Sequence, residues 1–367
     1  MIPINAPQIG DEEIEAVVKV MKSGGLTHGI GAGPKVTELE KGFAKYVNAK
    51  HAIAVNTGTA ALHSSLAVAG IKAGDEVILP SFTFVATAEV VAMLDAKPVF
   101  VDIDPETYCI DPEKIEKAVT EKTKVIMPVD LYGLPADLPR IRKIADKHEL
   151  PIIEDAAQAH GAVCKGKPAG GLADIACWSF YASKNMTTGE GGMITTNNDK
   201  YAEKLRWIRS HGEKVKYESL MLGHNYHMPE IEAAIGCVQL KRLPKFVSKR
   251  RSNAKRFTKD LGKAKKLQLP TEPRGFRSSW YLYTVRLKDG RKGTRDKIVA
   301  KLKQEDIGAE IYYVNPVHLM PFYHKFGKYR LPETEKASRQ VFSLPVHPGV
   351  TRKQVDFMSN TVLRLLK

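Results

Sequence analysis

Seven short apolar runs, separated by stretches of helical spacing, constrain the fold of this chain more than any other feature of its sequence. Between residues 50 and 200 these runs are HAIAVN, DEVILP, KPVFVDID, KVIMPVD, PIIEDAA, IACWSF and GGMITT. Most are continuous apolar runs, which is typical of strands buried on both faces. The segments between them, such as TAALHSSLAVAGI and PADLPRIRKIADKHEL, have helical periodicity. The alternation predicts an α/β domain with flanking helices and a mostly parallel sheet of roughly seven strands.

The pattern changes after Leu240. A basic helical stretch comes first, and the later segments SSWYLYTVRL and AEIYYV have strand character on either side of the helical RDKIVAKLKQEDI. This predicts a smaller C-terminal α+β domain. We expect a large domain over residues 1–245 and a small one over 246–367, with the boundary inside a helical stretch.

Composition excludes several classes of protein. With 367 residues, 43% of them hydrophobic and 26% charged, the chain resembles an ordinary soluble globular protein. The first residues lack a basic segment followed by an apolar one, and no apolar run reaches membrane-spanning length, so we expect a cytoplasmic protein without a membrane partner. The cysteines are scattered and predict neither a metal site nor a disulfide framework: Cys109, Cys164, Cys177 and Cys237.

The formal net charge of +15 is concentrated in part in KRLPKFVSKRRSNAKRFTKDLGKAKK. A solvated helical face is the simplest interpretation. Steering of an anionic substrate and nucleic-acid binding are alternatives. Since Phe246 and Phe257 are the only aromatic residues in that segment, a base-stacking surface has little support, and we expect no nucleic-acid partner.

Polar and aromatic residues follow five of the predicted strands at the points where the strands end, over residues 56–59, 81–84, 130–132, 154–155 and 179–184. In open α/β sheets, ligands bind beyond the carboxyl ends of the strands. We therefore expect these residues to face one crevice.

The chemistry of this set suits pyridoxal phosphate. Lys184, in SFYASKNMTTGEGGM, has small and aromatic neighbours, and an unprotonated amine there could bond to the cofactor's aldehyde. Asp155 could keep the pyridine nitrogen protonated. The helix that opens after residues 56–59 offers backbone amides to a phosphate, and Phe84 offers a stacking face. Each residue also has a simpler role: Lys184 as a solvated loop residue, Asp155 as a strand-end cap, and Phe84 as part of the core.

Motifs along nearly the whole chain resemble the DegT/StrS sugar-aminotransferase family, a branch of the fold-type I pyridoxal-phosphate enzymes, which are similar to aspartate aminotransferase. The motifs are GGLTHGIGAGPKVTELEKGFAKY, NTGTAALHSSL, GDEVILPSFTFVATA, AKPVFVDID, VDLYGLPAD, IIEDAAQAHGA, SFYASKNMTTGEGGMITTN, GHNYHMPEIEAAIG, NPVHLMPFY and SLPVHPGVT. The lysine motif and EDAAQ are the most specific of them.

The resemblance implies a role for individual residues. Lys184 is similar to the lysine that bonds to the cofactor and moves protons, and Asp155 to the partner of the pyridine nitrogen. Asn225 is similar to a residue that reaches the phosphate from the neighbouring subunit, and His318 to a histidine near the substrate. The other implied cofactor-binding residues are Gln158 near the 3-hydroxyl, Gly58, Thr59 and Ser179 at the phosphate, and Phe84 on the ring.

The same resemblance implies a homodimer that aminates a nucleotide-linked keto-sugar with glutamate as donor, in the biosynthesis of amino sugars and polysaccharides. Members with histidine at the position of Lys184 act as dehydratases, which this lysine argues against. His227 departs from the arginine common in the family, so any contact of that guanidinium is in doubt. Two alternatives stay open: the same chemistry on a non-nucleotide ketone such as a cyclitol, and a nucleic-acid-binding regulatory protein on the same scaffold.

Overall fold

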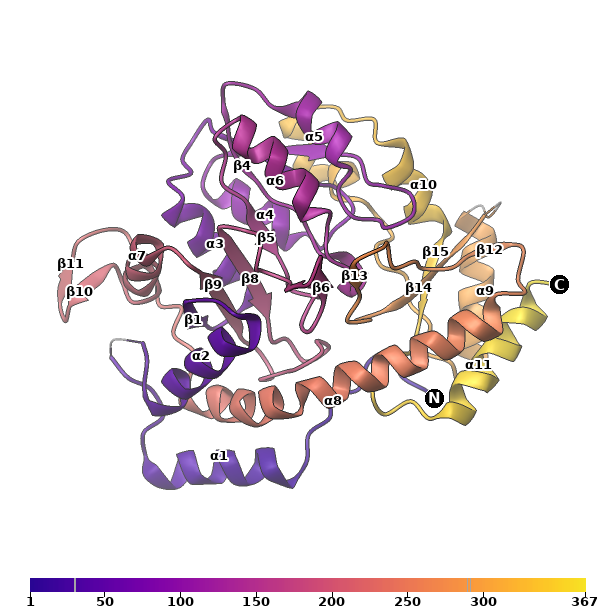
Figure 1. Cartoon of the computed structure of the whole chain (residues 1–367), viewed down its shortest axis with the longest axis horizontal. Coiled ribbons are helices and arrows are strands. Elements are labelled where there is room, and N and C mark those ends of the chain that lie inside the picture. Colours follow the sequence, from indigo (N-terminus) through magenta and orange to yellow (C-terminus); the bar gives the residue numbers. More distant parts are fainter. Residues whose placement is uncertain (30, 289, 291) are drawn as a thin grey trace.

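A computed structural model describes residues 1–29, 31–288, 290 and 292–367 of the chain. Its central feature is a sheet of seven strands (Figure 1). They are β1 (His51–Val55), β2 (Glu76–Pro80), β3 (Lys97–Val101), β4 (Thr123–Ile126), β5 (Ile153–Asp155), β8 (Ile175–Ser179) and β9 (Gly192–Thr196).

The strand order confirms the predicted mostly parallel sheet. Strands β1, β9, β8 and β5 are hydrogen-bonded in that order, and β4, β2 and β3 form a second group. Parallel bridges from Ile126 to Ile152 and from Val129 to Asp155 join the two groups. Among these seven strands as the structure describes them, β9 runs antiparallel to both neighbours, whereas the other pairings are parallel.

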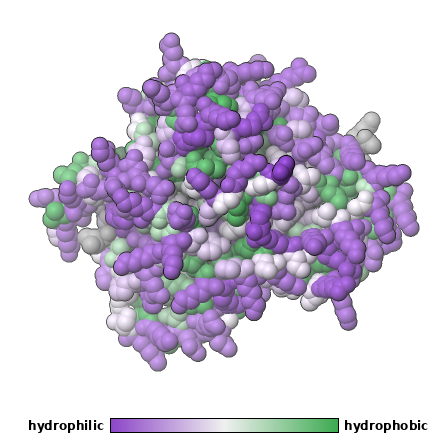
Figure 2. Space-filling model, in the orientation of Figure 1, coloured by the Kyte–Doolittle hydropathy of each residue, from purple (hydrophilic) through white to green (hydrophobic). Residues whose placement is uncertain are grey.

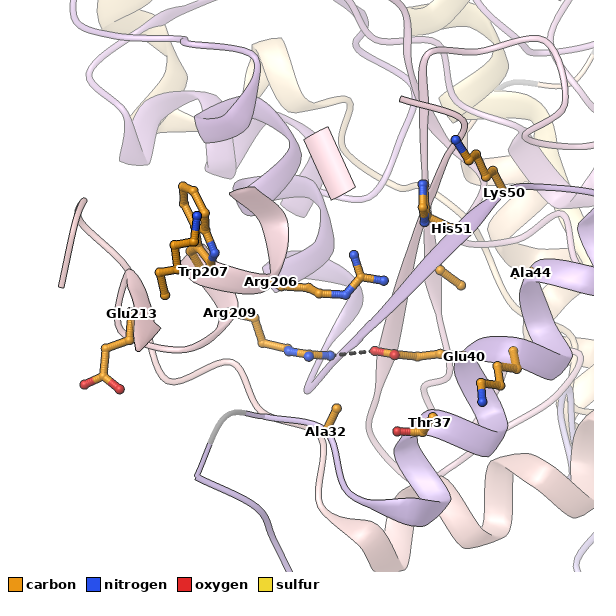
Figure 3. Close-up of a pocket in the computed structure, with 13 residues that line it drawn as sticks. Ala32, Thr37, Glu40, Ala44, Lys50, His51, Arg206, Trp207, Arg209 and Glu213 are labelled. Atoms are coloured by element: carbon orange, nitrogen blue, oxygen red, sulfur yellow. Dashed lines mark hydrogen bonds and ion pairs between the residues drawn. The ribbon is translucent and has the colours of Figure 1, made fainter. Parts of the chain in front are cut away.

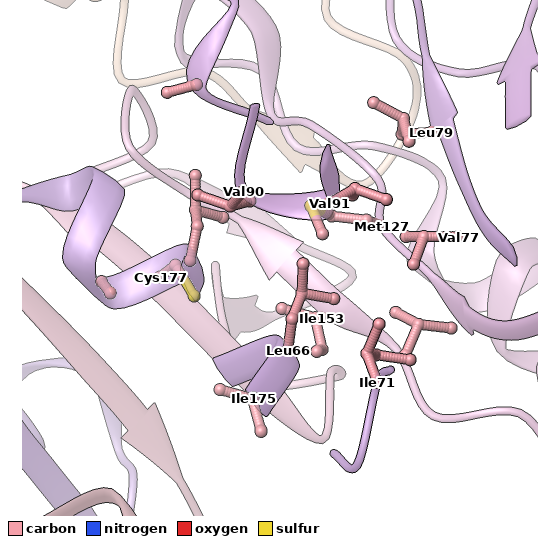
Figure 4. Packing of buried hydrophobic residues seen from close by; sticks show 14 of the residues in the cluster. Leu66, Ile71, Val77, Leu79, Val90, Val91, Met127, Ile153, Ile175 and Cys177 are labelled. Carbon is pink, nitrogen blue, oxygen red and sulfur yellow. The ribbon is translucent and has the colours of Figure 1, made fainter. Parts of the chain in front are cut away.

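Helices bury both faces of the sheet, which explains the continuous apolar runs. Helices α3 (Gly58–Val68), α4 (Ala86–Met93) and α7 (Asp199–Arg209) cover one face. There Leu66 and Val90 pack against strand residues such as Val77 and Ile153, as Figure 4 shows. Successive strand residues point to opposite faces, so each strand supplies apolar side chains to both cores.

The opposite face is covered in two parts. Helix α2 (Pro34–Val47) and the first half of α8 (Glu230–Leu261) pack over β1, β8 and β9, where Trp178 is fully buried. Helices α5 (Pro112–Ala118) and α6 (Leu138–Lys147) cover the side nearer β3 and β4.

The C-terminal part has its own three-stranded antiparallel sheet and its own core. The sheet contains β12 (Leu267–Gln268), β14 (Tyr283–Leu287) and β15 (Val341–Leu344). The second half of α8 packs there with α9 (Lys292–Gln304) and α11 (Arg352–Leu365). Helix α8 runs without a break through residue 245, so it belongs to both parts, and the domain boundary near that residue stays a prediction.

The prediction of a strand over residues 309–314 is wrong. Only an isolated bridge between Glu310 and Ser343 forms there among the described residues, and the backbone then turns. The turn brings Tyr313 to the side chain of Gln158, so tertiary contacts override the strand propensity of the apolar residues.

The other elements are short or peripheral. They are α1 (Asp11–Ser23), α10 (Pro332–Gln340), β6 (Val163–Cys164), β7 (Lys167–Pro168), β10 (Glu213–Val215), β11 (Glu218–Ser219), β13 (Phe276–Arg277), and the 3-10 turns η1 (Leu131–Gly133), η2 (Val317–Leu319) and η3 (Pro321–Phe326). All four cysteines are buried and free. Of the helices in the described ranges, none has the length and apolar content needed to cross a membrane.

Candidate functional site

Lys184 lies in the loop between β8 and β9, at the predicted edge of the sheet. Its backbone amide donates to the carbonyl of Tyr181 at 2.9 Å. Its side chain is half-buried, and Nζ lies 4.8 Å from the centre of the Tyr281 ring. This cation–π contact holds the amine against the face of an aromatic ring rather than in open solvent.

Asp155 ends β5 and is buried beside this lysine. Its Oδ2 accepts a hydrogen bond from the hydroxyl of Thr87 at 2.8 Å, and its Oδ1 accepts one from the amide of Ala157 at 3.2 Å. Burial raises the pKa of Asp155, while these two hydrogen bonds and the positive charge of Lys184 oppose the rise. A cationic ring nitrogen near this carboxyl would favour its charged form further.

Gln158 lies beyond Asp155, where the chain leaves the sheet. Its Oε1 accepts a hydrogen bond from the backbone amide of Tyr132 at 2.8 Å, and its Nε2 donates to the hydroxyl of Tyr313 at 3.2 Å. Both ends of the amide are therefore fixed, and the side chain is buried.

Gly58 lies against Ser179 at the start of α3, and Thr59 follows it in the helix; their role at a phosphate stays a prediction. Thr57 caps α3 by accepting a hydrogen bond from the amide of Ala60 at 3.0 Å, and the first amides of a helix have no intrahelical acceptor. A Cβ atom on Gly58 would lie 2.8 Å from Cβ of Ser179. Only glycine leaves room here, so the amides of α3 stay open to an anion.

Phe84 keeps an exposed face at the same edge. It follows β2, and 56% of its surface is exposed although the residues before it are buried. Its ring lies 6.3 Å from that of Tyr313 at an angle of 39°. An exposed aromatic ring beside a polar crevice is suited to stacking on a flat ligand.

Asp130 and Glu154, also predicted at strand ends, are structural. Both are buried, and burial together with the neighbouring Glu154 raises the pKa of Asp130 well above its usual value. Asp130 accepts a hydrogen bond from the amide of Ala136 at 2.9 Å, and Glu154 accepts one from the amide of Gly170 at 3.0 Å. They hold loops rather than face the crevice.

His318 is buried behind the end of β2. Its Nδ1 lies 2.6 Å from the hydroxyl of Ser81, and its backbone amide donates to the same hydroxyl at 3.0 Å. Burial lowers the pKa of His318, which Glu335 partly opposes at 3.6 Å from Nε2. The ring thus has an internal partner, and its role near a substrate stays a prediction.

Asn225 and His227 lie on a separate segment that precedes α8. Asn225 is exposed and forms a bridge with Ser210, whereas Nε2 of His227 lies 3.0 Å from the Ser210 hydroxyl. Burial, then the charge of Arg209, lowers the pKa of His227. Within the described part of the chain, neither Asn225 nor His227 forms a hydrogen bond or ion pair with Lys184.

Three residues of the crevice were missed by the sequence analysis: Thr87, Tyr281 and Tyr313. Thr87 lies in the first turn of α4, and its hydroxyl is 2.9 Å from that of Thr83, which precedes the helix. Tyr281 and Tyr313 lie in the C-terminal part, where no local pattern marked them.

A cavity of about 470 Å³ lies elsewhere, at the free edge of β1 between α2 and α7 (Figure 3). In its wall Arg209 and Glu40 form an ion pair of 2.6 Å. Glu40 accepts a hydrogen bond from the amide of Ala54, and Arg209 donates one to the carbonyl of the same residue. The pair therefore completes the hydrogen bonding of an edge strand, and none of the predicted site residues lines this cavity.

Comparisons with known proteins agree with the geometry. The sequence model of the DegT/DnrJ/EryC1/StrS aminotransferase family matches residues 7–363. The chain is 42% identical over 356 residues to the pleiotropic regulatory protein of Geobacillus stearothermophilus, covering 96% of this chain and 93% of that protein. It is 39% identical over 358 residues to GDP-perosamine synthase of Caulobacter vibrioides, with coverages of 97% and 95%. The structure of Spr1654 from Streptococcus pneumoniae in its PLP form superposes with a TM-score of 0.94 at 30% identity, covering 100% of this chain and 98% of that one.

Proposed function

Because the chain belongs to the DegT/DnrJ/EryC1/StrS aminotransferase family, we propose that it aminates a keto-sugar linked to a nucleoside diphosphate, with pyridoxal phosphate as cofactor and glutamate as donor. The convergence of three separate features carries this proposal. They are the Lys184 amine beside buried Asp155, the exposed ring of Phe84, and the close approach of Gly58 to Ser179 at the start of α3.

These residues fit the cofactor at both of its ends. Pyridoxal phosphate, when bound, supplies an aldehyde and an electron-withdrawing ring. Asp155 would face the ring nitrogen, Phe84 the ring plane and Gln158 the 3-hydroxyl. The amides of Gly58 and Thr59 and the hydroxyl of Ser179 would hold the phosphate.

Lys184 would have two tasks. Its amine would hold the cofactor until the donor amine displaces it. Once free, the same amine would accept the proton that leaves the donor's α-carbon, and it would supply a proton in turn when the keto-sugar is bound. Asp155 would stay charged throughout, because a cation opposite its carboxylate offsets the cost of burial.

The nucleotide-sugar substrate has indirect support. A relative at 39% identity is named GDP-perosamine synthase, and the net charge of +15 favours approach of an anionic nucleotide sugar. The product would be an amino sugar for a polysaccharide or another glycan.

A homodimer with shared sites is part of the proposal. The hairpin of β10 and β11 projects from the body of the chain (Figure 1), and Figure 2 shows hydrophobic surface at this end. The side chains of Tyr217 and Leu222 near it are each 83% exposed. Large apolar groups held out in this way suit burial against a second copy, which would take Asn225 to the partner's phosphate.

Reduction with borohydride tests the assignment of Lys184. It should attach the cofactor to the peptide that contains Lys184, and Lys184→Ala should remove that label. Lys200→Ala, at an exposed position, serves as the matched control and should retain it. Label on another lysine would overturn the assignment. A panel of nucleotide keto-sugars, assayed for glutamate-dependent amination, tests the substrate class, and a cyclitol ketone belongs in the same panel.

A regulatory protein on the same scaffold is the second candidate, favoured by one observation. The relative at 42% identity is named a pleiotropic regulatory protein. A yellow protein that bleaches on adding glutamate would favour the enzyme. Salt-sensitive binding to duplex DNA, without such bleaching, would favour the regulator.

A further inference from the structure

Three rings form a cluster behind the proposed phosphate site. His63 lies on α3, one turn beyond the helix start, and its Nδ1 is 3.2 Å from the hydroxyl of Tyr226. His224 stacks on Tyr226 with ring centres 4.7 Å apart and an angle of 16°, and it meets His63 edge-on at 5.0 Å. The cluster links α3 to the segment that carries Asn225.

His63 is a neutral partner in its hydrogen bond with Tyr226. Burial, then the neighbouring His224, lowers the pKa of His63 to about 4, so this ring is neutral at pH 7. A neutral imidazole keeps one nitrogen free to accept. The bond between the Tyr226 hydroxyl and Nδ1 of His63 therefore joins two neutral groups, and the tautomer of the ring sets which of them donates.

The backbone of Tyr226 is fixed as well. Its carbonyl accepts a hydrogen bond of 3.0 Å from the amide of Asn56, the residue just before the cap of α3. Its amide donates to the carbonyl of Arg209 at 3.0 Å. The side chain of Arg209 is itself held by Glu40, as Figure 3 shows. Tyr226 thus contacts the residue before the cap of α3, the middle of α3 and the end of α7.

Asn225 lies between the two stacked residues. In an extended segment successive side chains point to opposite sides, so a residue flanked by two inward rings points outward. Asn225 is exposed, whereas His224 and Tyr226 are half-buried. The ring cluster therefore sets both the position and the direction of Asn225.

We propose that Tyr226 is a positioning residue for cofactor phosphate, locking the segment that carries Asn225 onto the helix whose first turn receives a phosphate. The inference rests on the proposed function, because it takes the amides of Gly58 and Thr59 as the phosphate site. In the proposed dimer, the same contact connects the phosphate helix of one subunit to the residue that reaches the partner's phosphate.

The test is a pair of titrations on the full-length protein freed of cofactor, one with pyridoxal phosphate and one with pyridoxal, which lacks the phosphate. Tyr226→Phe removes only the hydroxyl. It should lower the affinity for pyridoxal phosphate about fivefold, the loss expected for one hydrogen bond, and leave the affinity for pyridoxal unchanged. At saturating cofactor, kcat should stay near that of the parent.

A double-mutant cycle checks that the bond itself matters. His63→Phe should lower the affinity for pyridoxal phosphate by a similar factor. The double variant should bind pyridoxal phosphate no more weakly than either single variant. Tyr201→Phe, a half-buried tyrosine on α7, is the matched hydroxyl deletion and should leave both affinities unchanged.

The outcomes separate the two proposals. Equal affinities of parent and Tyr226→Phe for pyridoxal phosphate would overturn the role of Tyr226. An equal loss of affinity for pyridoxal phosphate and for pyridoxal would overturn it too. If the parent binds no pyridoxal phosphate, the proposed function fails instead.

Discussion

The hydroxyl of Thr87 donates to Oδ2 of Asp155 at 2.8 Å, inside the protein and beside the Lys184 loop. Thr87 lies in the first turn of α4, and Asp155 ends β5, so the bond joins a helix on one face of the sheet to the carboxyl end of a strand. It fixes one oxygen of Asp155 and leaves the carboxylate orientation little freedom. The two residues should therefore act together on the cofactor ring.

Replacing each of them should produce losses of different size. Asp155→Ala removes the proposed partner of the ring nitrogen and should lower kcat at least about a hundredfold, the loss typical of a strong electrostatic contact in a catalytic site. Thr87→Val keeps the carboxylate and its shape, so its kcat should fall much less. Steady-state kinetics at saturating cofactor provides the comparison. Near-normal turnover in an Asp155→Ala protein that binds the cofactor would refute the role of Asp155.

Much of this arrangement could be predicted from the sequence, because the site residues directly follow strands. Asp155 is the last residue of β5, and Lys184 lies in the loop that follows β8. Parallel strands bring their carboxyl ends to one edge of a sheet, so the pattern alone predicts that these residues converge. That Gly58 and Ser179 lie together at a phosphate was implied by the family resemblance rather than by this pattern.

The other wall of the site depends on contacts that local patterns do not contain. Gln158 and Tyr313 are 155 positions apart, and Tyr281 reaches Lys184 from the C-terminal part. Such contacts depend on how the small sheet and α8 pack against the large one. The wrong strand prediction over residues 309–314 has the same origin, since that backbone follows the crevice rather than its own propensity.

Gly58→Ala tests the phosphate site by geometry. The new Cβ would lie 2.8 Å from Cβ of Ser179, well inside van der Waals contact, so the start of α3 must shift away from β8. We expect affinity for pyridoxal phosphate to fall about tenfold or more, whereas pyridoxal should be less affected. Gly293→Ala, in α9, is the control, because its Cβ would meet no atom within 4 Å. Unchanged affinity in Gly58→Ala would contradict the assignment.

His160 should make the protein sensitive to acid. It is fully buried against Trp178 and Phe180, with ring centres 5.4 Å and 5.8 Å away. Burial, then the charges of Lys184 and Arg250, lowers the pKa of His160 from 6.5 to about 3. The unfolded chain takes up a proton near pH 6.5 and the folded chain only near pH 3, so stability falls as the pH drops through this window. The loss is about 2 kcal/mol between pH 6.5 and 5.

His160→Phe should remove this contribution, because phenylalanine keeps the aromatic packing and takes up no proton. The free energy of unfolding, measured with urea from pH 7 to pH 5, should fall less steeply in the variant than in the parent. Identical slopes would mean that His160 is not the group responsible.

Mixing two inactive variants tests whether the site is shared between subunits. Asn225 is exposed, and no described contact brings it to Lys184 of its own chain, so in a two-fold dimer it would serve the partner's phosphate. In a mixed dimer of Lys184→Ala and Asn225→Ala chains, one site receives both defects and the other receives neither. With random exchange, half of the dimers are mixed and half of their sites are intact, so about a quarter of the parent activity should return.

Each variant alone must first be shown to be inactive. Mass spectrometry of the intact dimers confirms subunit exchange. No recovery after proven exchange, or full activity in a monomer, would show that one chain builds the whole site.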